Sequence, residues 1–424
     1  MSRYEWPIAV RQVDVALPLE PVTGLARYSR VRVFVSRGEC LVGSVDIWNR
    51  GAESISVQRL RDAIAARLAP EILERELRDR LESVDQRGPM AACTVSLIVP
   101  TCGRASDLRR CLESLVRQRT RHRLEVIVVD NRPSSGIAPA VVHEFASVRL
   151  VIEHRPGLSY ARNTGIRYAT GSIIVAVDDD VVAPEGWIEK LLAPFTRAEV
   201  MAVTGHVLPL ELETKAQCAF EAYGGLGKGF TRVEADGWWF RSHRSAVPTW
   251  RLGATANAAF RASIFAMPEI GLLDEALGAG TPTGCSEDTY LFYRILKAGH
   301  TIVYEPSAYV WHRHRASMSA LRAQIYAYSK GHVAYQLTTW LRDGDRRALL
   351  RLAYSLPRTY AERVWHRLRR YSDYPLSLVM LEIAGNLAGP VALWRSRRRV
   401  RRLGSGERSL AERRDAVSLE GQAP

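Results

Sequence analysis

The sequence predicts an α/β protein with a largely parallel, doubly wound central sheet. Three observations indicate this fold: short apolar runs recur from residue 94 onward, helical segments separate them, and polar residues follow the carboxyl ends of the runs. Alternating strands and helices are typical of a parallel sheet covered by helices on both faces. Such sheets bind their ligands at the carboxyl ends of the strands. We therefore expect the main domain to span residues 94–315.

The elements of this domain can be placed in order along the chain. The patterns predict four strands, over Val95–Val99, Val126–Val129, Val148–Ile152 and Ile173–Val177. Helices are predicted between them, over Asp107–Gln118, Pro139–Phe145 and Ser159–Tyr168. Further on, a helix over Thr289–Ala298 ends at Gly299, and a strand follows over Thr301–Tyr304.

Residues 1–88 are expected to form a small α+β accessory module. Val31–Ser36 and Cys40–Trp48 alternate like two strands of a hairpin, and Val57–Leu81 has helical spacing. No chemistry-bearing motif occurs in these segments, so we expect a structural or docking role. The segment from Asp85 to Pro89 is a predicted linker.

Residues 316–424 are expected to form a helical, Arg-rich extension. Its apolar stretch 375–394 is long enough to span a bilayer, but Glu382, Asn386 and Pro390 weaken a spanning helix. We favour a helix at the membrane surface over a packed core helix or a true span. Anionic lipid would then contact the arginines that follow it: Arg395, Arg397, Arg398, Arg399, Arg401 and Arg402.

The charge balance of the chain favours an acidic partner. Its 424 residues include 59 basic and 45 acidic side chains, for a net charge of +14. Nucleotide phosphates, an anionic membrane and nucleic acid all fit this charge. We do not expect a nucleic acid partner, because the carboxylates at the predicted strand ends would repel its phosphates.

The spacing of the cysteines and the first residues of the sequence indicate the cellular compartment of the protein. The six cysteines show no C-x-x-C spacing, which disfavours a zinc site or a dense disulfide scaffold and favours a reduced compartment. Met1–Pro7 lacks a basic segment followed by a long apolar run. We therefore expect a site that faces the cytoplasm, with peripheral contact to the inner face of the membrane.

Three adjacent carboxylates follow the apolar strand 173–177. Asp178, Asp179 and Asp180 repel one another unless a cation or a proton compensates them. On an extended backbone Asp178 and Asp180 point to the same side, and two such oxygen ligands suit Mg²⁺ or Mn²⁺. The alternative is a solvated turn after a strand, where Asp is common.

Two neighbouring strands also end in polar residues. Asp130 and Asn131 end one strand, and Pro100 to Arg104 ends another. An Asp130 carboxylate can accept a hydrogen bond from a base N–H, and Arg104 can neutralise phosphate. Arg162 lies near the start of a helix, where anions are attracted. Capping or turn roles, and a surface position for Arg162, are the alternatives.

Two later segments carry acids and an imidazole. Glu287 and Asp288 begin a helix, where acids favour the helix dipole, but a carboxylate there can also act as a general base. His312 can complete a metal site, and His314 is a weaker candidate. Arg313 and Arg315 can hold a departing diphosphate.

Together these motifs resemble family 2 glycosyltransferases of the GT-A fold. The resemblance covers residues 94–315 and rests on the order of Pro100-Thr101-x-x-Arg104, Val129-Asp130-Asn131, Arg162-Asn163-x-Gly165, Asp178-Asp179-Asp180, Glu287-Asp288 and His312. It implies an inverting single displacement in which Asp178 and Asp180 position the nucleoside diphosphate and its divalent cation, Mg²⁺ or Mn²⁺. Asp288, beside Glu287, would deprotonate the acceptor.

The resemblance also implies a nucleotide-sugar site. Pro100, Thr101, Arg104 and Asp130 would hold the nucleotide, with Arg162, Asn163 and Asp179 nearby. Gly253–Asn257 and Ala259–Arg261 resemble the strand that lines the donor sugar. Cys285-Ser286 departs from the Gly-Gly that many members carry, which predicts a different loop shape.

The predicted function is transfer of a sugar from a nucleoside-diphosphate sugar to an acceptor hydroxyl. The resemblance favours uracil as the base, with guanine and thymine left open. The C-terminal segment resembles that of bacterial members acting on lipid-linked or envelope acceptors. One alternative is a sugar nucleotidyltransferase, although Pro100–Asp107 lacks the Lys-containing Gly-rich loop of such enzymes. The other is a non-catalytic nucleotide-sugar-binding protein.

Overall fold

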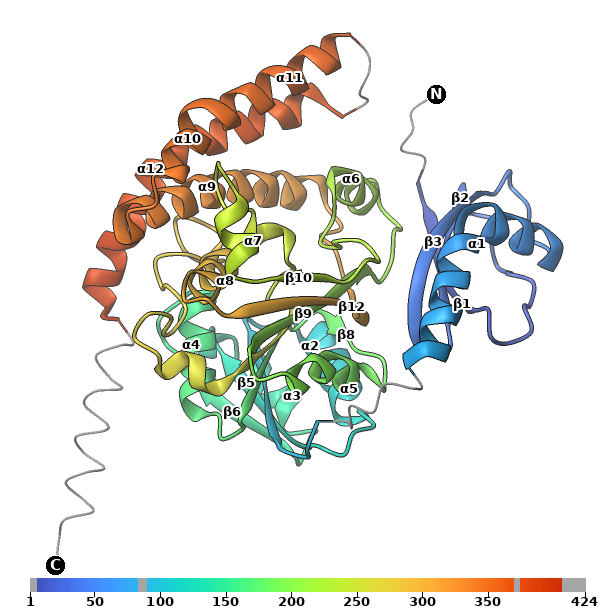
Figure 1. The fold of residues 1–424 in the computed structure, drawn as a ribbon, viewed down its shortest axis with the longest axis horizontal. Helices are drawn as coiled ribbons and strands as arrows, with labels where there is room; N and C mark the ends of the chain where they lie inside the picture. Colours follow the sequence, from blue (N-terminus) through green and yellow to red (C-terminus); the bar gives the residue numbers. More distant parts are fainter. Residues whose placement is uncertain (1–5, 83–89, 370–373, 406–424) are drawn as a thin grey trace, which may run out of the picture.

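The computed structural model describes residues 6–82, 90–369 and 374–405. A central mixed sheet with the order β10-β12-β9-β11-β7-β4-β5-β6 forms the main body, and β8 pairs with β12. A separate three-stranded sheet lies on one side of this body, and C-terminal helices lie along another (Figure 1). The predicted linker Asp85–Pro89 lies outside the described residues.

The first half of the central sheet is parallel, which confirms the predicted α/β class. Strands β4, β5, β6 and β7 pair in parallel. They alternate with helices in chain order: β4 (Thr94–Thr101), α2 (Ala105–Val116), β5 (Arg123–Asp130), α3 (Ile137–Val142), β6 (Val148–Ile152), α4 (Leu158–Tyr168) and β7 (Ile173–Val177).

The second half of the sheet is mixed. β11 is antiparallel to both β7 and β9, β12 is parallel to β9, and β8 and β10 are antiparallel to β12. Its elements are β8 (Val181–Val182), α5 (Trp187–Leu192), β9 (Val200–Pro209), α6 (Lys215–Tyr223), β10 (Val233–Ala235), α7 (Gly237–Ser242), β11 (Asn257–Arg261), α8 (Glu287–Lys297) and β12 (Thr301–His312).

Strand β12 is much longer than predicted. The sequence pattern ended it at Tyr304, but it continues to His312 after a register shift between Glu305 and Val310. Pro306 lies in this irregular stretch, and a β-bulge tolerates the missing N–H there. The extension carries His312 to the carboxyl edge of the sheet.

Helix α4 lies unusually close to the sheet. A Cβ atom added at Gly165 would lie 2.4 Å from the Cγ2 atom of Ile98 on β4. Only glycine permits this approach, so α4 holds Arg162 next to the strand ends.

The N-terminal residues form a sheet that docks on the main body. β1 (Ile8–Asp14), which the sequence pattern did not predict, is parallel to β2 (Arg30–Arg37), and β3 (Cys40–Trp48) and α1 (Val57–Glu82) follow. The rings of Phe34 and Trp311 lie 5.4 Å apart, edge to face. Gln12 donates a hydrogen bond of 2.8 Å to the hydroxyl of Tyr309. Both contacts are made to β12.

The C-terminal helices are α9 (Met318–Asp343), α10 (Arg347–Leu350), a π-helical turn (Arg351–Ser355), α11 (Leu356–Leu368) and α12 (Leu376–Leu403). α12 packs lengthwise on α9 (Figure 1). Cβ atoms added at Gly385 and Gly389 would lie 2.7 Å from the Cβ of Ser329 and 2.5 Å from the Cβ of Val333. The two helices therefore cross with close backbone contact.

Helix α12 is packed on one side and exposed on the other, and its predicted contact with a membrane surface stays a prediction. It packs on α9 with one face, while Leu387 and Trp394 on the other are 77% and 60% exposed. Among the described helices, it alone has the length and apolarity to cross a membrane, with a mean hydropathy of 1.6. Two arginines expected on lipid bind the main body instead: Arg397 pairs with Asp274 at 2.7 Å, and Arg399 donates to the carbonyl of Gly280.

We predict that Gly385→Leu destabilises the protein by about 1–3 kcal/mol, because the new side chain overlaps α9 and forces the helices apart. Chemical denaturation measures this change. Ala384→Leu, at the neighbouring exposed position, is the matched control and should change the free energy of unfolding by no more than about 0.5 kcal/mol. Equal effects of the two changes would contradict the close crossing.

Candidate active site

A cleft of about 1060 Å³ opens at the carboxyl edge of the sheet. The strand ends, the start of α8 and the C-terminal helices all contribute to its walls. Eight of the predicted site residues line it: Arg104, Arg162, Asp178, Asp180, Gly253, Glu287, Asp288 and His312. The structure thus brings together residues that lie up to about two hundred positions apart in the chain.

The three acids after β7 form a turn rather than the extended segment we expected. The N–H of Val181 donates to the carbonyl of Asp178 at 3.3 Å, which closes this turn. Asp178 and Asp180 still face the cleft, whereas Asp179 is buried and accepts a hydrogen bond of 2.7 Å from Thr101. Asp179 therefore supports the turn from behind.

Arg104 holds the turn together electrostatically. Its guanidinium donates to both Asp179 and Asp180. Burial raises the pKa of Asp179 to about 6, although Arg104 opposes this shift. Burial also tends to raise the pKa of Asp180, but His312 and Arg104 outweigh this effect and hold that pKa below its usual range.

Asp178, Asp180 and His312 form a candidate metal centre. One potential ligand atom from each lies within 4.8 Å of the others. Two carboxylates and an imidazole are a donor set that suits Mn²⁺ or Mg²⁺. Behind it, the Nδ1 atoms of His312 and His314 lie 3.3 Å apart, and Nε2 of His314 lies 2.9 Å from Glu221. This chain of contacts fixes the His312 ring.

Arg162 links the metal side of the cleft to the start of α8. It donates to Asp178 at 2.7 Å and to Glu287 at 2.9 Å, and is only 2% exposed. Burial raises the pKa of Glu287 to about 7; Asp288 adds to the shift and Arg162 opposes it. Glu287 is therefore a positioning partner of Arg162.

Asp288 faces the same cleft without a paired cation. Its Oδ1 accepts a hydrogen bond of 2.6 Å from the N–H of Thr289, and its Oδ2 accepts a long one of 3.4 Å from the N–H of Thr255. Among the described residues, no Arg, Lys or His forms an ion pair with it. The Oδ2 atom of Asp288 is thus only weakly hydrogen-bonded, so it can accept a proton from a ligand.

The loop before α8 contains Cys285 and Ser286, and the different loop shape expected from these two residues stays a prediction. Ser286 adopts φ of 79°, a conformation that favours glycine. Cys285 packs against Gly331 of α9, where an added Cβ would lie 2.2 Å from the cysteine sulfur. A glycine on the opposing helix thus makes room for the side chain that replaces glycine in the loop.

Five predicted site residues lie outside the cleft lining: Pro100, Thr101, Asp130, Asn163 and Asp179. Asp130 is fully buried, and its Oδ1 accepts a hydrogen bond from the N–H of Arg132 at 2.9 Å. Asn163 bonds both the carbonyl and the N–H of Leu273 at 2.9 Å. Asn163 thus ties helix α4 to the segment around Leu273, whereas the buried Oδ2 atom of Asp130 has no hydrogen-bond partner among the described residues. The nucleotide-binding roles expected for these residues stay predictions.

Among the cleft residues that the sequence analysis missed are three that can carry charge: Lys228, His332 and Arg351. Lys228 lies in the run Gly224-Gly225-Leu226-Gly227-Lys228-Gly229, and this glycine-rich composition was a usable signal. Burial lowers the pKa of Lys228, and the negative charge of Asp288 opposes that shift. His332 and Arg351 carried no recognisable spacing.

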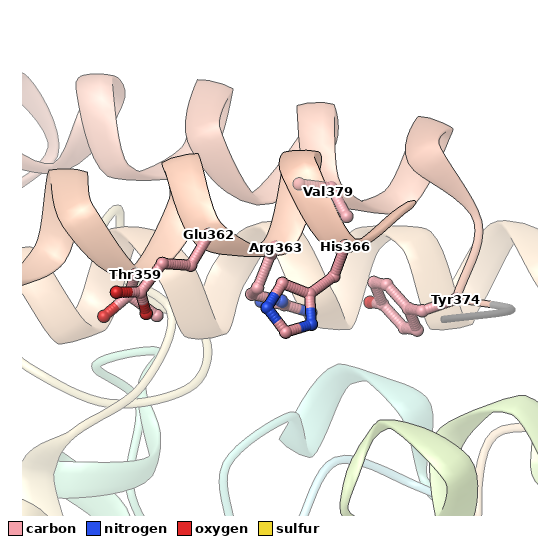
Figure 2. A pocket seen from close by; sticks show the side chains of 6 residues that line it. All are labelled: Thr359, Glu362, Arg363, His366, Tyr374 and Val379. Atoms are coloured by element: carbon pink, nitrogen blue, oxygen red, sulfur yellow. The ribbon is translucent and has the colours of Figure 1, made fainter. Parts of the chain in front are cut away.

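A smaller cavity of about 250 Å³ lies against helix α11 (Figure 2). Arg363 and Thr359 line both this cavity and the main cleft. Arg363 forms an ion pair of 2.6 Å with the buried Glu382, which also accepts hydrogen bonds from Tyr360 at 3.0 Å and Tyr374 at 2.9 Å. Helices α11 and α12 therefore form a polar wall next to the cleft.

These features define an α/β protein with an acid-rich ligand cleft at the carboxyl edge of its sheet. Residues 96–253 match the family described as Glycosyl transferase family 2. The matched segment covers less than half of the chain and includes strands β4 to β9, so this part of the protein is similar to that family. Asp288 and His312 lie beyond the matched residues.

Individual relatives are more distant. A pre-mycofactocin glycosyltransferase of Mycobacterium tuberculosis is 27% identical over 61% of this chain and 50% of its own length. The glycosyltransferase AglE of Haloferax volcanii is 31% identical over 27% of this chain and 39% of its own length. The chain thus spans half or less of the length of these relatives.

A solved structure was also found. It is a mannosyltransferase from Pyrobaculum calidifontis in complex with GDP-Man and Mn²⁺. It is 20% identical, with a TM-score of 0.48, over 71% of this chain and 88% of the other.

We predict that Arg162→Met destabilises the protein by about 3 kcal/mol or more, because it leaves Glu287 buried without a counter-charge. Thermal or chemical unfolding measures the loss. Arg119→Met is the matched control: Arg119 also pairs with a glutamate, Glu185, but at 83% side-chain exposure, and its loss should cost less than about 1 kcal/mol. A similarly small effect at Arg162 would show that this buried pair contributes little.

Proposed function

We propose that this chain transfers a sugar from a nucleoside-diphosphate sugar to an acceptor hydroxyl, with inversion at the anomeric carbon. The observation that carries the proposal is the placement of two different groups in one cleft. Asp178, Asp180 and His312 form a candidate cation site, and Asp288 presents a carboxylate without a paired cation. The similarity of residues 96–253 to family 2 glycosyltransferases supports the same chemistry.

The donor would lie between the strand ends and Gly253. Arg104 and Arg162 line this part of the cleft and can shift from their carboxylates to phosphate oxygens. A divalent cation held by Asp178, Asp180 and His312 would neutralise the charge of the diphosphate. Uracil remains the favoured base, with guanine and thymine as alternatives.

Asp288 is the proposed general base. Its weakly bonded Oδ2 atom accepts the proton of the acceptor hydroxyl. At the same time the hydroxyl oxygen bonds to the anomeric carbon, and the bond from this carbon to the diphosphate breaks. The nucleoside diphosphate leaves with the electron pair. Thr289 and Thr255 hold the Asp288 carboxylate in place through their backbone N–H groups.

The first test of this proposal is calorimetric titration of the full chain with UDP, GDP and dTDP, each with Mn²⁺, with Mg²⁺ and with EDTA. We expect one nucleotide to bind in a metal-dependent manner, because the acids repel its phosphates when no cation is present. Binding without turnover of any donor would favour a non-catalytic binding protein. Formation of a nucleotide sugar from a sugar phosphate and a nucleoside triphosphate would favour a nucleotidyltransferase.

Two variants separate binding from catalysis. Asp288→Asn should lower the rate of transfer or donor hydrolysis by at least about 100-fold while nucleotide affinity stays nearly unchanged, since the amide cannot accept the proton. Asp180→Ala should weaken metal-dependent nucleotide binding. Glu185→Gln, which changes an exposed carboxylate, is the control. Equal loss of nucleotide affinity in both site variants would contradict this division of roles.

We also propose that the outer face of α12 contacts the anionic inner surface of a membrane. Its exposed apolar residues are spaced along one side of the helix: Leu376, Met380, Leu387, Val391 and Trp394. Exposed arginines follow them at the end of the helix: Arg395, Arg398, Arg401 and Arg402. An apolar stripe followed by cations is complementary to an anionic lipid surface. A lipid-linked acceptor would fit this location.

Vesicle flotation of the full chain tests the contact. Binding to vesicles of phosphatidylcholine and phosphatidylglycerol should exceed binding to pure phosphatidylcholine, and Leu387→Ser with Trp394→Ser should reduce it by about tenfold or more. Leu73→Ser, at a 60% exposed position of α1, is the control and should have no effect. Equal binding of this variant and the α12 variant would overturn the proposal.

A further inference from the structure

Arg351 occupies an unusual position in the cleft wall. It begins the π-helical turn 351–355 between α10 and α11, and it lines the same cleft as Asp288. π-helical turns are rare and frequently occur at functional sites, because the wider turn redirects side chains. The turn thus presents a guanidinium to the interior of the cleft.

The structure supplies no acid to this guanidinium. Among the described residues, Arg351 has no ion-pair partner, whereas Arg363, farther along the same helical segment, pairs with Glu382 at 2.6 Å. Its Nε lies 3.5 Å from Nε2 of His332, and its guanidinium lies 5.9 Å from the ring centre of Trp250. Burial lowers the pKa of Arg351; Tyr360 opposes this shift, and the positive charge of Arg251 adds to it.

The imidazole of His332 is suited to a position beside the Arg351 cation, because it is uncharged there. Burial lowers the pKa of His332 to about 3, and the positive charge of Arg351 also lowers it. The ring is therefore neutral near pH 7 and can accept a hydrogen bond from Arg351. Trp250 packs edge to face against it, with ring centres 4.9 Å apart. The two rings brace Arg351 without neutralising it.

A partly buried cation that lacks a counter-ion is costly unless a ligand supplies the negative charge. The diphosphate of a donor is an unsuitable source, because the proposed donor contacts come from the strand ends. The cleft volume of about 1060 Å³ is at the upper limit of the roughly 300–1,000 Å³ typical of small-molecule sites, which leaves room for a second ligand.

We infer that Arg351 is the anion contact of an acceptor subsite, and that the acceptor carries a carboxylate or phosphate in addition to the hydroxyl that receives the sugar. This inference rests on the proposed transferase function, since it takes Asp288 as the acceptor end of the cleft. Arg351 binds and orients the acceptor; it takes no part in bond formation.

The test uses the full chain saturated with Mn²⁺ and the nucleotide that binds, so that the donor site is filled. Three probes are titrated by calorimetry: methyl glucoside, which is neutral, methyl glucuronide, which carries a carboxylate, and glucose 6-phosphate. At least one anionic probe should bind roughly 10- to 100-fold more tightly than the neutral probe, the value of a charge-assisted hydrogen bond. Carboxylate and phosphate acceptors are distinguished by which probe binds more tightly.

Variants connect this preference to one residue. Arg351→Gln should abolish the preference for anionic probes, Arg351→Lys should keep part of it, and Arg346→Gln, at an exposed position in the preceding turn, should leave it unchanged. Unchanged nucleotide affinity in all three variants shows that the chain is folded. Equal binding of neutral and anionic probes, no binding of either anionic probe, or a preference that survives Arg351→Gln would overturn the inference. Loss of metal-dependent nucleotide binding in the unmodified chain would instead contradict the donor site.

Discussion

Compensation of crowded carboxylates by two arginines is the constraint on which the site depends. Asp178, Asp179, Asp180 and Glu287 would repel one another if left alone at one edge of the sheet. Arg104 bridges two of them and Arg162 bridges the other two, across separate elements of the fold. The same arginines are the ones proposed to contact the phosphates of a donor. Under that proposal, one set of charges both stabilises the cleft and binds the donor.

This arrangement explains why the acid motif could be found from sequence but not fully interpreted. Three adjacent aspartates after an apolar strand can be recognised from the sequence alone. The alternation of strands and helices likewise predicts the parallel half of the sheet. The turn closed by the N–H of Val181 determines which of the three aspartates face the cleft, and no sequence pattern predicts that turn. Asn163 bonds Leu273, more than a hundred residues away, and only the folded chain reveals that approach.

The parts that escaped prediction share a physical cause. β12 could not be extended beyond Tyr304 because Pro306 breaks the strand pattern, and the bulge that accommodates it depends on pairing with β9. Arg351 and His332 lie on helices whose role is set by packing over the cleft. Local periodicity was enough to predict the strands and helices of residues 94–177. The cleft wall formed by the C-terminal helices depends on long-range contacts between helices, which one sequence does not display.

The alternation of side chains along β12 connects the N-terminal sheet to the candidate metal centre. Trp311 turns towards Phe34 of the N-terminal sheet, and its neighbour His312 turns towards Asp180. Removal of the N-terminal sheet alone would expose the indole of Trp311 and the ring of Tyr309, which contact Phe34 and Gln12. Trp311 directly precedes His312, a candidate metal ligand, so the N-terminal sheet supports the strand end that carries this residue.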